Sequence, residues 1–279
     1  MIVNHPLLEQ PTEVEIVDES HEPWILVRCK KTDFHFIANP PTYDRLTEEF
    51  AWEKTIESAR ERRHSEEKLI RVVSTVAKKI KVVVSPRRNK MFDLACRVLS
   101  TRSGGTYRVL DVGCGNGKNV VRFCRRFQQL GIQIKPVGIE VSTVLAQKSR
   151  RKFSEFDGEV VENNAIDGMD AITPGSIDIV TMLSFLEHEC RPLSLLRSIH
   201  KVLIPNGSVI VKVPNFNSWN RKVRGSRWAG YRFPDHVSYF TSTTLHLLAK
   251  QAGFVLRPQP FRDRLPTSDN MYGILTKAG

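Results

Sequence analysis

The chain reads RVLDVGCGNGK over residues 108–118. Val109–Val112 is a short apolar run of the kind that forms a buried strand, with one acid, Asp111, inside it. Glycines follow at positions 113, 115 and 117, and a helix is expected to begin near Lys118. Glycine permits positive φ and close backbone approach, and the first turn of a helix offers unpaired amides. The pattern therefore predicts a ligand-binding turn between a strand and a helix.

A rhythm of strands and helices continues from this turn to the end of the chain. Apolar runs separated by helical segments are typical of a parallel sheet covered by helices on both faces. The last two runs are joined by a Pro-rich connection too short for a crossover helix, so we expect them to pair antiparallel and close the sheet. The expected strands are Arg108–Val112, Pro136–Glu140, Glu159–Glu162, Ile177–Leu183, Gly207–Val213, Phe254–Arg257 and Met271–Thr276.

Two acids beside the glycine turn restrict the ligand. Glu140 ends the second strand, where a carboxylate can accept hydrogen bonds from both ribose hydroxyls of an adenosine. A dinucleotide fits less well, because the third glycine of its fingerprint would fall at position 118, which is lysine. Asp111 would repel a pyrophosphate, whereas it suits a ligand with a positive amino group and a sulfonium. These features favour S-adenosylmethionine.

Five motifs in order resemble those of the class I S-adenosylmethionine-dependent methyltransferases. They are Val109–Gly117, Val137–Ser142, Ile177–Val180, Phe185–His188 and Ile199–Gly207, the last with Pro-Asn-Gly where the family usually has Pro-Gly-Gly. The resemblance runs from Tyr107 to the C-terminus. It implies an α/β fold with a Rossmann-like, seven-stranded, mostly parallel sheet and helices on both faces.

The resemblance also implies which residues hold the cofactor. Gly113 and Gly115 would lie near the methionine moiety, and Glu140 would bind the ribose. The family often has an Asp–Ala pair after strand three that contacts adenine; here the pair is Asn164-Ala165, and the asparagine can still accept from the adenine amino group. The implied set is Asp111, Gly113, Cys114, Gly115, Glu140, Val141, Asn164, Ala165 and Leu183.

The later segment Val213–Thr241 resembles a bacterial subgroup related to the ubiquinone-biosynthesis O-methyltransferases. In that subgroup an insertion after strand five, here residues 215–240, lies over the substrate pocket. In the quinone branch two glutamates and a histidine around strand four bind a metal ion. This chain has Ser184 in place of the first glutamate, followed by Glu187 and His188. Because one of three ligands is missing, we expect no metal.

The chain before residue 106 is expected to form two further parts. Residues 1–44 predict a small β-hairpin from Trp24–Arg28 and Phe34–Ala38. This part resembles a degenerate zinc ribbon, with Cys29-Lys-Lys-Thr32 where relatives have C-x-x-C, and no zinc is expected because the upstream cysteines are absent. Residues 45–105 predict a helical extension that ends in a short helix at Met91–Leu99, and residues 106–279 the cofactor-binding domain.

Two histidines are the candidates for catalysis. Methyl transfer from a sulfonium is an in-line displacement from an activated donor, so positioning should dominate, and a general base helps when the acceptor is a hydroxyl. His188 follows strand four, whose end faces the transferred methyl group, and is the first candidate. His236, in the segment that covers the pocket, is the second.

Charge and cysteine usage bear on partners and location. The 279 residues carry a net charge of +12, and residues 1–44, with eight acids and three bases, carry −5, which leaves +17 on the rest. A basic body favours an anionic partner. Five scattered cysteines without a C-x-x-C pair favour a reducing cytoplasm. No secretory signal and no apolar run of the ~18 residues that span a membrane are visible, so a cytoplasmic protein is expected.

The span Trp219–Phe233 interleaves arginine and lysine with aromatic residues, and the sequence leaves its partner open. Such a span can stack on bases, lie on an anionic membrane surface, or cover an acceptor. We expect a methyltransferase acting on a small molecule, with O-methylation favoured and nucleic acid favoured less. The alternatives are an RNA methyltransferase and a non-catalytic binding protein of the same fold. The oligomeric state is left open.

Overall fold

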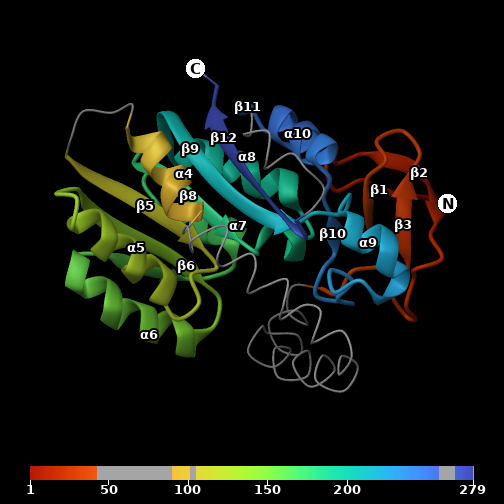
Figure 1. Cartoon of the computed structure of the whole chain (residues 1–279), viewed down its shortest axis with the longest axis horizontal. Coiled ribbons are helices and arrows are strands. Elements are labelled where there is room, and N and C mark those ends of the chain that lie inside the picture. The colour runs from red at the N-terminus through yellow and green to blue at the C-terminus, as the bar shows by residue number, and fades with distance from the viewer. Residues whose placement is uncertain (43–89, 101–104, 258–267, 279) are drawn as a thin grey trace. The chain divides into compact units, whose positions relative to one another are not determined.

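The computed structural model describes residues 1–42, 90–100, 105–257 and 268–278 (Figure 1). The chain divides into two compact units, one made of Met1–Pro40 with Arg102–Gly279 and the other of Pro41–Thr101. In the second unit the structure describes the helix α4 (Lys90–Leu99), as expected from Met91–Leu99. The rest of the expected helical extension lies outside the described residues.

The first unit contains the expected seven-stranded sheet. Its strands lie in the order β11-β12-β9-β8-β5-β6-β7. The pairs among β5 to β9 are parallel, and β12 runs antiparallel to both of its neighbours. This confirms the predicted fold class and the antiparallel closing pair. The bounds are β5 (Thr106–Val112), β6 (Gln133–Glu140), β7 (Glu159–Glu162), β8 (Ile177–Leu183), β9 (Leu203–Pro214), β11 (Phe254–Leu256) and β12 (Asn270–Lys277).

The direction of the crossovers explains where the helices lie. From β5 the chain moves outward through β6 to β7, then returns to β8 on the other side of β5 and moves outward to β9. Right-handed crossovers in opposite directions place their helices on opposite faces of the sheet. Accordingly, α5 contacts α6, whereas α8 contacts α7 and α10. The helices are α5 (Lys118–Gln128), α6 (Thr143–Phe153), α7 (Ala165–Gly168), α8 (Pro192–Val202), α9 (Trp219–Arg224) and α10 (Ser242–Gln251), with 3₁₀ turns η1 (Ser154–Phe156), η2 (Met169–Ala171), η3 (Leu186–His188) and η4 (Gly225–Arg227).

The N-terminal forty residues form a second sheet, to which the later part of the chain adds one strand. Its order is β1-β2-β3-β4-β10, all antiparallel. The predicted hairpin is present as β3 (Leu26–Cys29) and β4 (His35–Ile37), whereas β1 (Ile2–Asn4) and β2 (Pro11–Ile16) were not predicted individually. The fifth strand, β10 (Ser238–Tyr239), comes from the predicted insertion and lies beside the N-terminal strands in Figure 1. The predicted domain boundaries stay a prediction, but the segment shares this sheet with the insertion.

The two sheets share one hydrophobic core. Leu7, Phe34 and Phe36 from the N-terminal segment belong to the same buried cluster as Phe240 and Leu196. The rings of Phe34 and Phe240 pack in a tilted arrangement, with 5.3 Å between their centroids. The turn between β1 and β2 is tied to α8, because Glu9 pairs with Arg197 at 2.6 Å. The N-terminal segment is therefore held to the rest of its unit by packing and by hydrogen bonds.

The turn that resembles a zinc ribbon is closed by side-chain hydrogen bonds. His5 Nε2 lies 2.8 Å from Thr32 Oγ1, and Cys29 Sγ lies 3.5 Å from Thr12 Oγ1. The degenerate zinc ribbon and the expected absence of zinc stay predictions. Among the described residues, no helix has the length and apolar character needed to cross a membrane.

Candidate functional site

The strand order reverses at β5, between β6 and β8, and the carboxyl ends of these strands carry the predicted cofactor residues. In open α/β sheets, ligands bind outside the carboxyl ends of the strands at such a switch point. The glycine loop follows β5, Glu140 is the last residue of β6, and Leu183 is the last residue of β8. The fold thus places three of the predicted segments at one edge of the sheet.

The glycine loop needs its first glycine for two reasons. Gly113 has a φ of +68°, which L side chains rarely adopt. A Cβ at this position would also lie 2.5 Å from the ring of Phe185, the second residue after β8. The loop is anchored to the next strand, because the amides of Gly113 and Cys114 both donate to the carbonyl oxygen of Ile139. This geometry brings the loop into contact with the segment that follows β8.

Asp111 is a buried acid below the loop. Its side chain accepts a hydrogen bond from Thr181 Oγ1 at 2.5 Å, across the β5–β8 pair. Burial, with a smaller contribution from the nearby Glu140 charge, raises the pKa of Asp111 to about 7, against the opposing effect of the Thr181 hydrogen bond. A cationic ligand beside Asp111 would favour its ionised form, as expected for a cofactor with ammonium and sulfonium groups.

Glu140 is oriented by backbone amides. Its Oε2 accepts from Gly115 N at 2.7 Å and its Oε1 from Ser142 N at 3.0 Å. The carboxylate is thus held next to the glycine loop in a fixed orientation, in agreement with the position predicted for a ribose-binding group. The ribose contact itself stays a prediction.

Asn164 has a structural role that the sequence did not indicate. Its Oδ1 accepts from the amides of Ile166 and Asp167, and its Nδ2 donates to Asp167 Oδ2, so the side chain caps α7. Both acceptor positions of Oδ1 are then used. Accepting from an adenine amino group would require the loss of one capping bond, and this contact stays a prediction. Ala165, the next residue, is buried.

The remaining predicted cofactor residues differ in exposure. The thiol of Cys114 lies against β6, since a Cβ at Gly138 would be 2.7 Å from its sulfur, and burial raises its pKa to about 12. The Cys114 thiol is therefore packed between the glycine loop and β6 and is protonated at neutral pH. Val141 is 45% exposed and Leu183 is half-buried. Both side chains flank the carboxyl ends of their strands.

The two predicted catalytic histidines lie together, with a glutamate as the third member of the cluster. One ligand atom of each of Glu187, His188 and His236 lies within 4.8 Å of the other two. Glu187 and His188 belong to η3, directly after β8, whereas His236 comes from the insertion 48 residues later. We refer to these three residues as the Glu-His-His cluster. Because Phe185 contacts Gly113, the cluster begins two residues from a contact with the glycine loop.

Backbone hydrogen bonds fix the three members relative to one another. The amide of Val237 donates to the carbonyl of Glu187 at 2.9 Å, which joins the insertion to η3. His188 Nδ1 lies 2.8 Å from the carbonyl oxygen of Asp235, and His236 Nδ1 lies 2.8 Å from that of Gly230. Each Nδ1 therefore carries the proton, and each lone pair is on Nε2. Burial, together with the charge of Arg232, lowers the pKa of His188 to about 4, so this ring is neutral at pH 7.

Glu187 is the least satisfied member of the cluster. It is 1% exposed, and its Oε2 has no hydrogen-bond partner among the described residues. Burial raises its pKa to about 7. Two cations act on it only at a distance, because Lys212 donates to Ser184 Oγ and Arg232 pairs with Asp235. Natural structures rarely leave a buried polar atom without a partner, so this oxygen needs an explanation.

Most aromatic residues of the insertion are used for packing. Trp228 and Tyr239 are buried with Phe216 and Leu26 in a small core, and Tyr231 packs against it. Arg221 stacks on the Phe216 ring at 3.7 Å and donates to Tyr231 Oη. These rings are therefore not presented as a stacking surface. Trp219 (56% exposed) and Val223 (86% exposed), both on α9, are the exceptions among the described large apolar residues of this segment.

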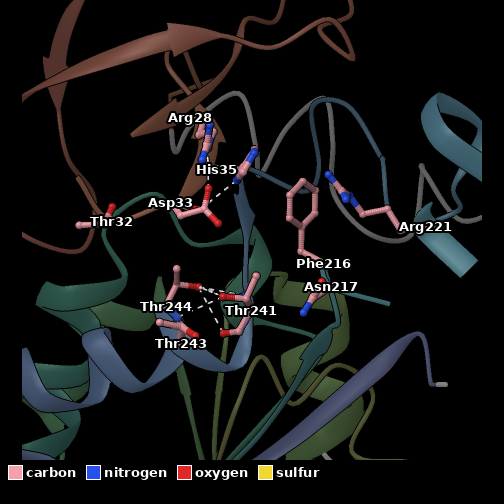
Figure 2. Close-up of a pocket in the computed structure, with 10 residues that line it drawn as sticks. All are labelled: Arg28, Thr32, Asp33, His35, Phe216, Asn217, Arg221, Thr241, Thr243 and Thr244. Atoms are coloured by element: carbon pink, nitrogen blue, oxygen red, sulfur yellow. Dashed lines mark hydrogen bonds and ion pairs between the residues drawn. The ribbon is translucent and has the colours of Figure 1, made fainter. Parts of the chain in front are cut away.

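A cavity of about 440 Å³ lies between the N-terminal sheet and the start of α10 (Figure 2). Figure 2 shows the Phe216 ring between His35 and Arg221, and the charged group of Arg28 paired with Asp33. None of the predicted cofactor or catalytic residues lines this cavity. Its polar groups are largely engaged with one another, which is typical of a cleft between packed elements.

Three residues of the site were not predicted as members: Thr181, Phe185 and Glu187. Thr181 and Phe185 act on Asp111 and Gly113 across strands that are far apart in the chain, and no local pattern indicates this. Glu187 was considered as a metal ligand and set aside because Ser184 replaces its usual partner. The structure brings the catalytic candidates together, which sequence spacing alone did not show.

Comparison with known proteins places this arrangement in context. A methyltransferase-domain family matches residues 61–259. The chain is 27% identical over 170 residues to a ubiquinone biosynthesis O-methyltransferase from Aeromonas salmonicida, covering 57% of this chain and 68% of that protein. It is 33% identical over 132 residues to the Yersinia pestis protein of the same name, covering 46% of this chain and 52% of that protein. The chain thus spans about half the length of the Yersinia relative.

Among solved structures, the citrinin polyketide synthase CMeT domain has the same fold. Its TM-score is 0.50 at 16% identity, covering 73% of this chain and 56% of that chain. At this identity the likeness concerns the fold alone.

Proposed function

The chain belongs to the methyltransferase-domain family, and we propose that it transfers a methyl group from S-adenosylmethionine to a hydroxyl oxygen of a small molecule. The observation that carries the choice of a hydroxyl is the Glu-His-His cluster. It lies at the end of β8 next to the glycine loop and brings the carboxyl group of Glu187 and two imidazoles, of which that of His188 is neutral at pH 7, to one point. An acceptor hydroxyl must lose a proton during transfer, and such groups hold or remove one.

The names of the relatives support the same choice. Two proteins with which the chain shares 27% and 33% identity are described as O-methyltransferases of ubiquinone biosynthesis. We propose the transfer to oxygen on this basis, without assigning a quinone as the acceptor. A phenolic, isoprenoid or glycan hydroxyl would suit the proposal equally.

The cofactor residues follow from the geometry of the strand ends. We propose that Glu140, held by two amides, accepts from the ribose, and that Asp111 faces the cationic part of the donor. In this arrangement the methyl group lies on the side of the loop where Phe185 and the cluster follow β8. The acceptor hydroxyl would then lie between this methyl group and the Glu-His-His cluster.

RNA as an acceptor is supported less. Stacking on bases requires exposed aromatic faces, whereas Trp228, Tyr231 and Tyr239 are packed in the core of the insertion. The net charge of +12 remains in favour of an anionic partner. A membrane surface stays a proposal that rests on exposed Trp219 and Val223 beside basic residues of α9.

The proposed reaction is tested by mass spectrometry with a panel of hydroxylated small molecules and with RNA. We expect a mass increase of one methyl group on an oxygen of a small molecule. His188→Ala should slow this reaction by roughly 10²–10⁴-fold, because it removes a group at the acceptor's proton. The exposed His246 provides the matched control, and His246→Ala should leave the rate unchanged.

Two results would contradict this proposal. Methylation of RNA but of no small molecule would replace the acceptor class. Binding of the cofactor without turnover on either panel would favour the non-catalytic alternative.

A further inference from the structure

The Glu-His-His cluster has the composition and convergence of a metal site. One ligand atom from each side chain lies within 4.8 Å of the other two. Ligands of a tetrahedral ion with bonds of about 2.1 Å lie about 3.4 Å apart, so binding would draw these atoms inward by on the order of 1 Å. Side-chain rotation alone can supply such a shift.

The two histidines are held as ligating histidines usually are. A metal-bound imidazole typically donates its other N–H to a carboxylate or a backbone carbonyl, which fixes the tautomer and the ring orientation. His188 Nδ1 and His236 Nδ1 each meet a backbone carbonyl at 2.8 Å, from Asp235 and Gly230. In both rings the ligating lone pair is then on Nε2, which is the atom that the metal would use.

The third donor gives an independent indication. Glu187 Oε2 is fully buried without a hydrogen-bond partner among the described residues. Among the described residues, Lys212 donates to Ser184 Oγ and Arg232 to Asp235 Oδ2, and neither cation bonds to Glu187 Oε2. A buried carboxylate without a contact partner is costly, and coordination of a cation is one of the ways in which proteins satisfy it. The residues present therefore fit a cation.

We propose that Glu187, His188 and His236 bind one divalent transition-metal ion, with His236 from the insertion supplying the third ligand in a chain where Ser184 replaces a glutamate. This proposal deepens the proposed function. The role of the ion beside the acceptor rests on the proposed function, whereas the binding of the ion does not. With an ion bound, the Nε2 atoms would serve as ligands, and the ion would promote loss of the acceptor's proton by lowering the pKa of a hydroxyl that coordinates it, in place of His188 as the base.

The donor set also selects the kind of ion. Imidazole nitrogens suit zinc, iron, nickel and copper, whereas magnesium prefers oxygen donors. A site with two imidazoles and one carboxylate should therefore favour Zn²⁺ or Co²⁺ over Mg²⁺. A site built from two glutamates and one histidine would offer more oxygen donors, which are hard ligands, and would accept Mg²⁺ more readily. The exchange of one carboxylate for His236 predicts a change of metal preference.

The test uses the full chain after removal of metals with a chelator, with no acceptor present. We expect Co²⁺ to produce visible d–d absorption that saturates at one equivalent, and calorimetry to give matching one-to-one binding of Zn²⁺. Mg²⁺ should bind more than about 100-fold more weakly. Thiolate-to-cobalt charge-transfer absorption should be absent, since it would indicate the free cysteines and contradict the assignment.

Variants identify the ligands. Glu187→Gln keeps the shape of the side chain and removes the charge, so it should fold normally and lose more than about 100-fold in affinity, beyond the 10–100-fold typical of outer-shell changes. His236→Gln should do the same, with folding checked by thermal melting. His246→Gln, at an exposed histidine outside the cluster, should bind as the parent protein does.

Several results would overturn the proposal. They are the absence of a saturable cobalt signal in the parent protein, unchanged binding in Glu187→Gln or in His236→Gln, and tighter binding of Mg²⁺ than of Zn²⁺. Because metal binding is measured without an acceptor, its result is separate from that of the methylation assay. A bound metal without methyl transfer would count against the proposed function alone.

Discussion

At the scale of single residues, the most consequential group beside the proposed donor site is Asp111. Its carboxyl is buried and close to a second acid, which raises its pKa to about 7 although a hydrogen bond from Thr181 opposes the shift. Near neutral pH it therefore exists in both protonation states. A cationic ligand selects the ionised one, so ligand binding and proton release are linked at this position.

This linkage predicts a pH-dependent affinity for S-adenosylmethionine. Below pH 7 Asp111 must lose its proton before it can face the cation, so the affinity should fall as the pH is lowered, by up to about tenfold per unit. Above the pKa it should level off. Calorimetric titrations between pH 6 and 8 would measure this, and Asp111→Asn should flatten the curve. An unchanged slope in the variant would assign the pH dependence to another group.

Gly113 and Gly115 offer a matched pair for the glycine loop. Both have positive φ, but a Cβ at Gly113 meets Phe185, whereas one at Gly115 has nothing within 4 Å. We expect Gly115→Ala to lower the free energy of unfolding by about 1–2 kcal/mol through backbone strain, and Gly113→Ala by about 1–3 kcal/mol more through overpacking. Urea unfolding without cofactor measures both free energies. Equal losses in the two variants would show that the Phe185 ring moves aside without a free-energy penalty.

At the scale of elements, the alternation of apolar runs and helical segments was sufficient to predict all seven strands of the large sheet. The antiparallel pair β11–β12 was expected from the short final connection, whereas the order of the strands comes from the structure. The small sheet was less predictable. β2 alternates polar and apolar residues only over Glu13–Ile16 and buries only Val14, and β10 has two residues, so both strands give short signals.

The candidate site, too, could be predicted from the sequence only in part. Residues on local motifs, such as Gly113 and Glu140, could be placed at the strand ends from the sequence. The convergence of His188 with His236 could not, because it depends on how the insertion returns to η3 through Val237. Glu187 was not predicted as a metal ligand, because Ser184 replaces the glutamate expected before it in the sequence. In the structure its neighbour His236 comes from the insertion. Asn164 was assigned to the ligand, and its capping of α7 depends on the observed helix start.

At the scale of the whole unit, the N-terminal segment and the large sheet share one core, so their stabilities should be coupled. Phe34→Ala removes a fully buried ring from that core and should lower the free energy of unfolding by about 3–5 kcal/mol. Ile16→Ala, at a site that is 62% exposed, should change it by less than about 0.5 kcal/mol.

The coupling is checked by following the unfolding of Phe34→Ala with two probes, far-ultraviolet circular dichroism and tryptophan fluorescence. Coincident transitions, both shifted, are expected for one cooperative unit. A large-sheet transition left at the parent position would show that the N-terminal segment unfolds by itself.

The pairing of β4 with β10 also has a consequence for the order of events during synthesis. The edge of β4 leaves the ribosome early, but its partner, Ser238–Tyr239, follows about 200 residues later. At 5–20 residues per second the delay is roughly 10–40 s. During that time an unpaired strand edge beside apolar Phe34 and Phe36 is a template for unwanted association. A nascent chain of this protein should therefore depend on chaperones until its insertion has emerged.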